Sequence, residues 1–185
     1  MTHDHSPDPS PWIARFAGLV PPGARVLDLA AGGGRHARLF ASRGARVVAV
    51  DRDAQALRSL AAVEGVETRV ADLEDGRWPL AGEVFDAIVV VNYLHRPLFP
   101  HVRAALARDG VLLYETFATG NEAYGRPANP DFLLCSGELL SVASISPAMT
   151  VVAFEQGLVR GEERAAVVQR LAAVGPDRRW PPALG

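Results

Sequence analysis

A run of three glycines between two short apolar stretches constrains the fold of this chain more than any other feature. Residues 26–29 form the first apolar stretch, the glycines follow at 32–34, and residues 47–50 form the second stretch. Residues 36–42 between them have helical character, and Gly44 stands where the C-terminal cap of such a helix falls. The pattern predicts strand, turn, helix and strand, which is the building unit of a parallel α/β sheet.

The same glycines predict a ligand site. A backbone without side chains at the carboxyl end of a strand lets a ligand approach closely and meet the N–H groups that open the next helix. Asp51 ends the second strand, where a carboxylate can accept hydrogen bonds from a ribose diol. The spacing from Gly32 to Ala37, with Asp51 about 20 residues on, fits the dinucleotide fingerprint. The stretch is therefore interpreted as half of a nucleotide-cofactor site.

Three features argue against a nicotinamide cofactor. Asp28 ends the first strand, where an acid crowds a pyrophosphate but suits a ligand that carries an amino group. All 19 basic residues are arginine, so the chain has no Tyr-x-x-x-Lys pair of the kind that dehydrogenases use. The 185 residues also leave no room for a separate substrate domain. An NAD(P)-dependent oxidoreductase is kept as the alternative function.

Five motifs follow one another between residues 26 and 117. They are the apolar, acidic and glycine-rich stretch 26–34, Asp51, Asp72 after the apolar stretch 66–70, the Phe85-Asp86 strand 85–91, and the glycine-initiated strand 109–114. In this order they resemble the motifs of the class I S-adenosylmethionine-dependent methyltransferases, with Ala30 where that family has its first glycine. The finer resemblance is to the small, single-domain bacterial members of the tellurite-resistance type.

This resemblance implies both a fold and a reaction. The fold is a doubly wound, Rossmann-like, mostly parallel seven-stranded sheet with an antiparallel C-terminal strand pair, for which residues 149–154 and 165–171 are the candidates. The cofactor is S-adenosylmethionine and the product S-adenosylhomocysteine. The methyl group moves by in-line displacement, which needs alignment and exclusion of water but no covalent enzyme intermediate. Because Ala30 departs from the motif, a non-catalytic S-adenosylmethionine-binding module is a further alternative.

The resemblance also assigns residues to the methyl donor. Asp51 is expected to bind the ribose, Asp72 to accept from the adenine amine, and Leu73 to pack on the ring. Arg35 opens the helix beside the cofactor and is expected to reach its carboxylate or an anionic substrate. The full set of expected donor-binding residues is Asp28, Ala30, Gly32, Gly34, Arg35, Asp51, Arg52, Asp72, Leu73 and Asn92.

Substrate-side residues are expected directly after the fourth strand, the most continuous apolar run in the chain. Residues just beyond the carboxyl end of a central strand point into the ligand crevice. Tyr93 and His95 are the catalytic candidates there, with His95 as a general base, and Arg96 is a substrate contact. The alternative is that His95 and Arg96 fix the loop through hydrogen bonds to the backbone.

The stretch 115–135 is polar and rich in glycine and proline, which in a compact domain is typical of a functional loop. It is interpreted as a lid over the donor, with Tyr124 and Arg126 as substrate contacts, and an ordinary surface loop is the alternative. Shorter patterns predict helices from Pro11, with Ser10 as N-cap, and over residues 54–62, 100–107 and 138–142.

Composition limits the remaining choices. The chain is 49% hydrophobic and 22% charged with a net charge of −2, which indicates one cytoplasmic globular domain over residues 10–175, with tails at 1–9 and 176–185. No apolar run is long enough to span a membrane. The acidic balance favours a small-molecule acceptor over nucleic acid. A monomer or homodimer is expected, and no metal site, since His3 and His5 in the tail have no partner ligands.

Overall fold

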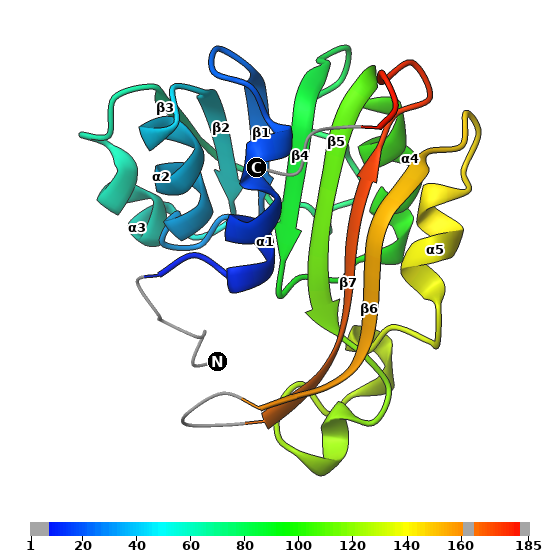
Figure 1. The fold of residues 1–185 in the computed structure, drawn as a ribbon. Coiled ribbons are helices and arrows are strands. Elements are labelled where there is room, and N and C mark those ends of the chain that lie inside the picture. Colours follow the sequence, from blue (N-terminus) through cyan, green and yellow to red (C-terminus); the bar gives the residue numbers. More distant parts are fainter. Residues whose placement is uncertain (1–7, 161–164, 182–185) are drawn as a thin grey trace.

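A computed structural model describes residues 8–160 and 165–181 of the chain. Seven strands form one sheet in the order β3-β2-β1-β4-β5-β7-β6 (Figure 1). The first five are parallel, and β7 is antiparallel to both of its neighbours, which confirms the predicted mixed sheet. The strands are β1 (Arg25–Leu29), β2 (Arg46–Asp51), β3 (Val66–Val70), β4 (Phe85–Val91), β5 (Leu106–Phe117), β6 (Thr150–Arg160) and β7 (Ala165–Val174).

The helices are short. They are α1 (Pro11–Phe16), α2 (Arg35–Ser42), α3 (Ala54–Leu57), α4 (Phe99–Ala104) and α5 (Glu138–Ala143), with the 3-10 turns η1 (Ala17–Leu19), η2 (Arg58–Leu60), η3 (Arg96–Leu98), η4 (Asn121–Ala123) and η5 (Pro130–Phe132). Ser10 caps α1 as predicted, because its hydroxyl accepts the N–H of Trp12. The predicted helix over 54–62 is wrong in length, since its last turn tightens into η2, as is common at helix ends.

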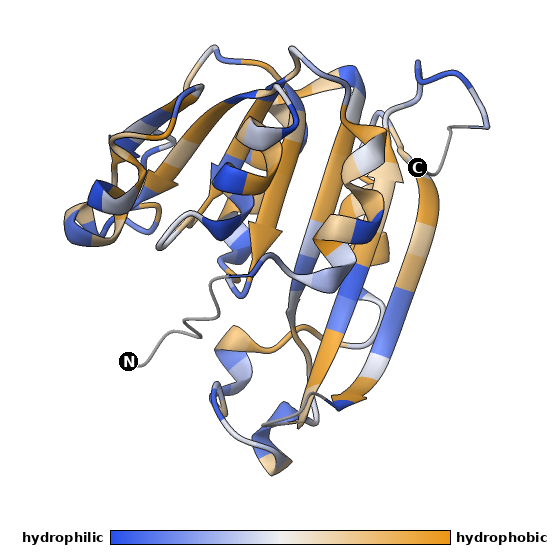
Figure 2. Ribbon diagram, turned by 60° about the vertical axis from the view of Figure 1, so that its left-hand side comes forward, coloured by the Kyte–Doolittle hydropathy of each residue, from blue (hydrophilic) through white to orange (hydrophobic). Residues whose placement is uncertain are grey.

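Each face of the sheet buries its own apolar core. Trp12 of α1, Phe40 of α2 and Leu57 of α3 pack on one face. Val102 of α4 and Leu139 of α5 pack on the other. β4 is buried along nearly its whole length, as expected for a central strand covered on both sides. Figure 2 shows the resulting band of hydrophobic residues through the middle of the sheet.

The strand order reverses between β1 and β4, and the crevice expected of such a sheet falls at the carboxyl ends of these two strands. The chain winds outward through β2 and β3 on one side of β1, and through β4 and β5 on the other. Such a reversal in an open parallel sheet is where α/β proteins bind their ligands. The stretch between β5 and α5 lies at this same edge, below the end of the sheet (Figure 1).

The C-terminal strands are longer than the sequence predicted. β6 and β7 pair from Thr150 with Val174 to Arg160 with Ala165. Residues 161–164, which join them in sequence, lie outside the described residues, as does most of the predicted N-terminal tail. Beyond β7, Asp177 pairs with Arg108 at 2.7 Å, and Arg178 donates to the carbonyl oxygen of Leu19. Among the described residues, no helix is long and apolar enough to cross a bilayer.

Candidate functional site

The glycine turn leaves an open surface at the end of β1. At Gly32 and Gly33 an added Cβ would meet no atom within 4 Å, so both positions border open space. Gly34 has a different role, because a Cβ there would lie 2.4 Å from the side chain of Leu60. Gly34 therefore lets α2 start close to η2, while the two glycines before it leave backbone accessible to a ligand.

Asp51 anchors this turn from the neighbouring strand. One carboxylate oxygen accepts the N–H of Gly32 at 2.7 Å, and the other accepts the N–H of Asp53 at 2.8 Å. The residue is half-buried at the end of β2, and Arg52 beside it is exposed. A carboxylate oxygen has room for a second hydrogen bond, so Asp51 can hold the turn and still accept from a ribose hydroxyl.

Asp28 lies beneath the turn. Its side chain is 1% exposed and accepts the N–H of Ala37, in the first turn of α2, at 2.9 Å. Burial raises the pKa of this carboxyl group from 3.8 to about 7, although the hydrogen bond from Ala37 and the charge of Arg35 act in the opposite direction. The structure thus places Asp28 below the ligand surface, where it positions the start of α2.

A buried polar chain that sequence reasoning missed connects α1 to the site. The ring Nε2 of His36 accepts the backbone N–H of Ser10 at 3.1 Å. The Ser10 hydroxyl donates to Glu115 at 2.9 Å, and Glu115 forms an ion pair with Arg170 of β7 at 2.8 Å. Burial, and then the charge of Arg35, lower the pKa of His36 from 6.5 to about 3, which keeps the ring neutral and able to accept. The N-cap signal at Ser10 was readable, but its distant partners were not.

The predicted adenine side lies at the end of β3. Asp72 is exposed and accepts the N–H of Glu74 at 2.9 Å, while Leu73 is buried. Asp51 lies next to it, because Asp51 pairs with Val70 and its carbonyl accepts the N–H of Ala71. The structure thus brings Asp51, Asp72 and Leu73 together at adjacent strand ends.

Tyr93 turns towards this adenine side, although the sequence analysis placed it on the substrate side. Its hydroxyl oxygen is buried, and the carboxylate of Glu74 is the polar group beside it. Burial, and then the nearby carboxylates of Glu74 and Asp72, raise its pKa. Tyr93 therefore joins the residues around the expected cofactor.

Two residues at the strand ends adopt strained backbone. Ala30 has φ 57° and Asn92 has φ 56°, in the left-handed region that residues other than glycine rarely occupy. Asn92 is exposed, and its N–H donates to the carbonyl of Glu115 at 2.9 Å. Strain of this kind clusters at functional sites. Ala30 thus keeps the turn that a glycine would make, at an energetic cost.

Replacing Ala30 by glycine is expected to stabilise the protein by about 0.5–1 kcal/mol, because relief of the left-handed strain exceeds the added chain entropy of glycine. Urea unfolding measures the change. Ala31→Gly is the matched control: Ala31 is buried and is not in the left-handed region, so this variant is expected to lose stability. Equal losses in both variants would contradict the strain at Ala30.

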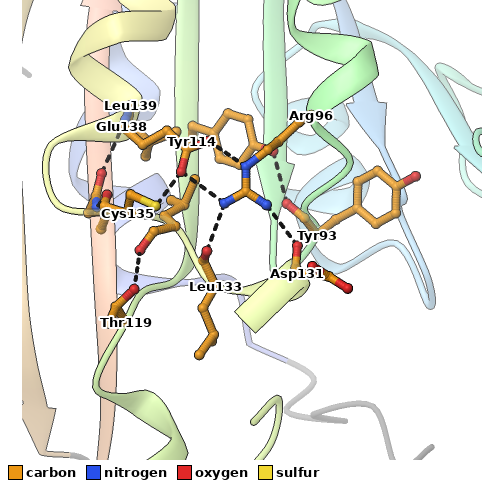
Figure 3. A network of polar contacts seen from close by, with 11 residues as sticks. Tyr93, Arg96, Tyr114, Thr119, Asp131, Leu133, Cys135, Glu138 and Leu139 are labelled. Carbon is orange, nitrogen blue, oxygen red and sulfur yellow. Dashed lines mark hydrogen bonds and ion pairs between the residues drawn. The ribbon is translucent and has the colours of Figure 1, made fainter. Parts of the chain in front are cut away.

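The segment after β4 divides the remaining candidates. His95 is half-buried, and its ring makes no hydrogen bond within the described residues. Arg96 is engaged: its guanidinium group bonds to Glu138 and to the carbonyl oxygens of Asp131 and Leu133 (Figure 3). The alternative in which these residues fix the loop through hydrogen bonds to the backbone therefore holds for Arg96 and not for His95.

The loop between β5 and α5 carries the last two candidates. Tyr124 and Arg126 are exposed, and neither side chain makes a hydrogen bond within the described part of the chain. Asn121 is buried beside them, donating to the carbonyl of Pro127 and accepting the N–H of Val167 of β7. No cluster of three or more histidine, cysteine or acidic residues among the described residues is arranged to hold a metal ion.

Comparisons with known proteins agree with this geometry. Residues 26–110 match the family model of a methyltransferase domain. TehB from Haemophilus influenzae superposes with a TM-score of 0.70 at 17% identity, over 86% of this chain and 59% of its own, so the chain spans less than two thirds of that protein. A TehB-like S-adenosylmethionine-dependent methyltransferase from Corynebacterium glutamicum superposes with a TM-score of 0.63 at 20% identity, over 88% of this chain and 86% of its own.

A third solved structure extends the likeness. The S-adenosylmethionine-dependent methyltransferase from Mesorhizobium loti superposes with a TM-score of 0.66 at 18% identity, over 86% of this chain and 95% of its own. At these identities the likeness is one of fold. No curated protein sequence matches the chain.

Proposed function

We propose that this protein is a class I S-adenosylmethionine-dependent methyltransferase that transfers the donor's methyl group to a small-molecule acceptor, and the match of residues 26–110 to a methyltransferase domain supports this. The observation that carries the proposal is the open glycine turn at Gly32 and Gly33, with Asp51 and Asp72 at the two adjacent strand ends. An open backbone flanked by two carboxylates suits a ligand with a ribose diol and an adenine amine.

The residues present fit this cofactor. The buried hydroxyl of Tyr93 lies on the adenine side, near Glu74 and Asp72, where a bound nucleoside offers further polar atoms. Asp51 and Asp72 would hold the ribose and the base, and Arg35 at the start of α2 would face the carboxylate. Bound S-adenosylmethionine supplies a methyl group made electrophilic by its sulfonium sulfur.

The chain itself then has to align the acceptor and exclude water. Asn92 and His95 follow β4, whose carboxyl end meets the transferable methyl in the proposed arrangement. His95 would accept the acceptor's proton at a ring nitrogen where the nucleophile must lose one, and its free ring supports this role. The net charge of −2 supports a small-molecule acceptor over nucleic acid. A cytoplasmic monomer or homodimer built on a domain over residues 10–175 belongs to the same proposal.

Calorimetric titration with S-adenosylhomocysteine, NADH and NADPH tests the cofactor. Binding of S-adenosylhomocysteine alone is expected, at micromolar concentration. Binding of a nicotinamide cofactor instead would contradict the methyltransferase proposal and support the oxidoreductase alternative. Methyl transfer to small acceptors then separates an enzyme from a module that only binds the donor.

Replacing Asp51 by alanine is expected to weaken S-adenosylhomocysteine binding by about 1–3 kcal/mol, or roughly 5–150-fold, because the ribose loses its acceptor. The matched control is Asp53→Ala. Asp53 caps α3 by accepting the N–H groups of Gln55 and Ala56, so its loss should lower stability and leave affinity unchanged. Equal affinity in the Asp51 variant and the parent would remove Asp51 from the site.

A further inference from the structure

The stretch between β5 and α5 is held by hydrogen bonds within itself and by two side-chain links to β7. Asn121 bonds to Pro127 and Val167, and Thr119 donates to the carbonyl of Leu134 at 3.1 Å. Gln169 of β7, which is fully buried, accepts the N–H of Leu139 and donates to the carbonyl of Cys135. A loop held in this way is part of the fold, not a free flap.

Arg96, at the start of η3 after β4, bonds to this stretch and to the start of α5. Its Nε and one terminal nitrogen bond to the two oxygens of Glu138 at 2.7 and 3.0 Å, which is a bidentate pair. The terminal nitrogens also donate to the carbonyl oxygens of Asp131 at 2.9 Å and Leu133 at 2.8 Å. Figure 3 shows the guanidinium group at the centre of these contacts. Four bonds converge on one planar group, which lysine cannot reproduce.

Tyr114 holds the other end of the short segment 93–96, to which Arg96 belongs. The buried hydroxyl of Tyr114, on β5, donates to the backbone carbonyl of Tyr93 at 2.9 Å (Figure 3). The ring of Tyr93 lies near Asp72 and Glu74, on the expected adenine side. Residues 93–96 therefore run from the cofactor side of the crevice to the loop between β5 and α5.

We propose that Arg96 is a positioning residue, which holds the stretch 129–138 against the end of β4 and so fixes the wall of the acceptor site relative to the bound donor. This inference rests on the proposed function. Its physical reason is that methyl transfer depends on alignment, and that displacement of a reacting group by about 1 Å can cost roughly a hundredfold in rate. Arg96 thus contributes through the loop it holds and not through contact with the acceptor.

Hydrogen exchange with and without S-adenosylhomocysteine tests this proposal. Arg96→Met keeps the apolar stem and removes all four bonds, so amide protection in residues 129–138 is expected to fall at least about tenfold. S-adenosylhomocysteine should add protection to these residues in the parent protein, and this increment should disappear in the variant. Affinity for S-adenosylhomocysteine should stay within about threefold, because Arg96 touches no donor-binding residue. Arg96→Lys keeps the charge near Glu138 and should still lose most of the protection.

Arg108→Met is the matched control, since Arg108 forms a similar bidentate pair with Asp177 away from the crevice. It should leave both measurements unchanged. Amide protection equal to that of the parent in Arg96→Met would overturn the proposal. Reduced protection that S-adenosylhomocysteine still increases would also overturn it, because Arg96 would then stabilise the loop without coupling it to the bound donor. If the parent protein does not bind S-adenosylhomocysteine, the proposed function fails and the inference fails with it.

Discussion

Replacing Asp28 by asparagine is expected to make the protein progressively more stable than its parent as the pH rises, by about 4 kcal/mol near neutral pH and above. The pKa of Asp28 is raised from 3.8 when unfolded to about 7 when folded. Between these values the folded state binds more protons than the unfolded state, so stability falls as pH rises. Asparagine keeps an acceptor for the N–H of Ala37 and cannot ionise, so the variant avoids this loss.

His36 acts in the opposite direction over much of the same range. Its pKa is lowered from 6.5 to about 3 on folding, so the unfolded state binds the extra proton and stability rises with pH between these values. The two slopes oppose each other where the windows overlap, which flattens the pH dependence of the parent. Asp28→Asn should therefore unmask a steady rise in stability from acid to near pH 6.5, followed by a plateau.

Urea unfolding of parent and variant across this pH range measures the difference. His36→Gln is the companion variant: it removes the opposing titration, so its stability should fall as pH rises through the Asp28 window. Parallel pH profiles for the parent and Asp28→Asn would show that Asp28 is ionised in the folded protein with an ordinary pKa. In that case the buried carboxyl would not carry the free-energy cost assigned to it.

Local patterns in the sequence predicted the fold and indicated that Asp51 and Asp72 lie at adjacent strand ends. The glycine turn, Asp51 and Asp72 are each specified by a short stretch whose chemistry is independent of distant residues. Their relative placement followed from strand order, because parallel strands meet at one edge of the sheet. The structure confirms the mixed seven-stranded sheet on which that placement depends.

The substrate half resisted prediction because its contacts are distant in sequence. Arg96 and Glu138 are 42 residues apart, and Ser10 and Glu115 are 105 apart, so no spacing rule connects them. Tyr93 was predicted on the substrate side from its position after β4, whereas its ring lies near Asp72 and Glu74 after β3, a proximity that no local spacing indicates. These residues show that a strand end predicts which residues reach the crevice and not which wall they form.

Replacing Glu115 by alanine is expected to destabilise the protein by about 3 kcal/mol, near the lower end for a broken buried ion pair, because Arg170 loses its shorter and more buried carboxylate partner. The side chains of Glu115 and Arg170 are 11% and 16% exposed, so solvent does little to compensate. Arg170 retains a longer contact with Glu155 at 3.4 Å, which limits the loss. Asp177→Ala, which breaks an exposed ion pair, should cause no measurable change in urea unfolding.

The same variant tests whether α1 depends on this buried chain. The Ser10 hydroxyl loses its acceptor when Glu115 is removed. In the Glu115→Ala background, Ser10→Ala should therefore lower the free energy of unfolding by little more than the loss of its cap on α1. A double-mutant cycle measures this coupling, and additive losses would show that the two residues act independently. Coupling would tie the docking of α1 to β5 and β7, and through the N–H that Ser10 donates to His36, to the start of α2 beside the glycine turn. Glu115 on β5 would then stabilise the start of α2 through Ser10 and His36, although it lies away from the glycine turn itself.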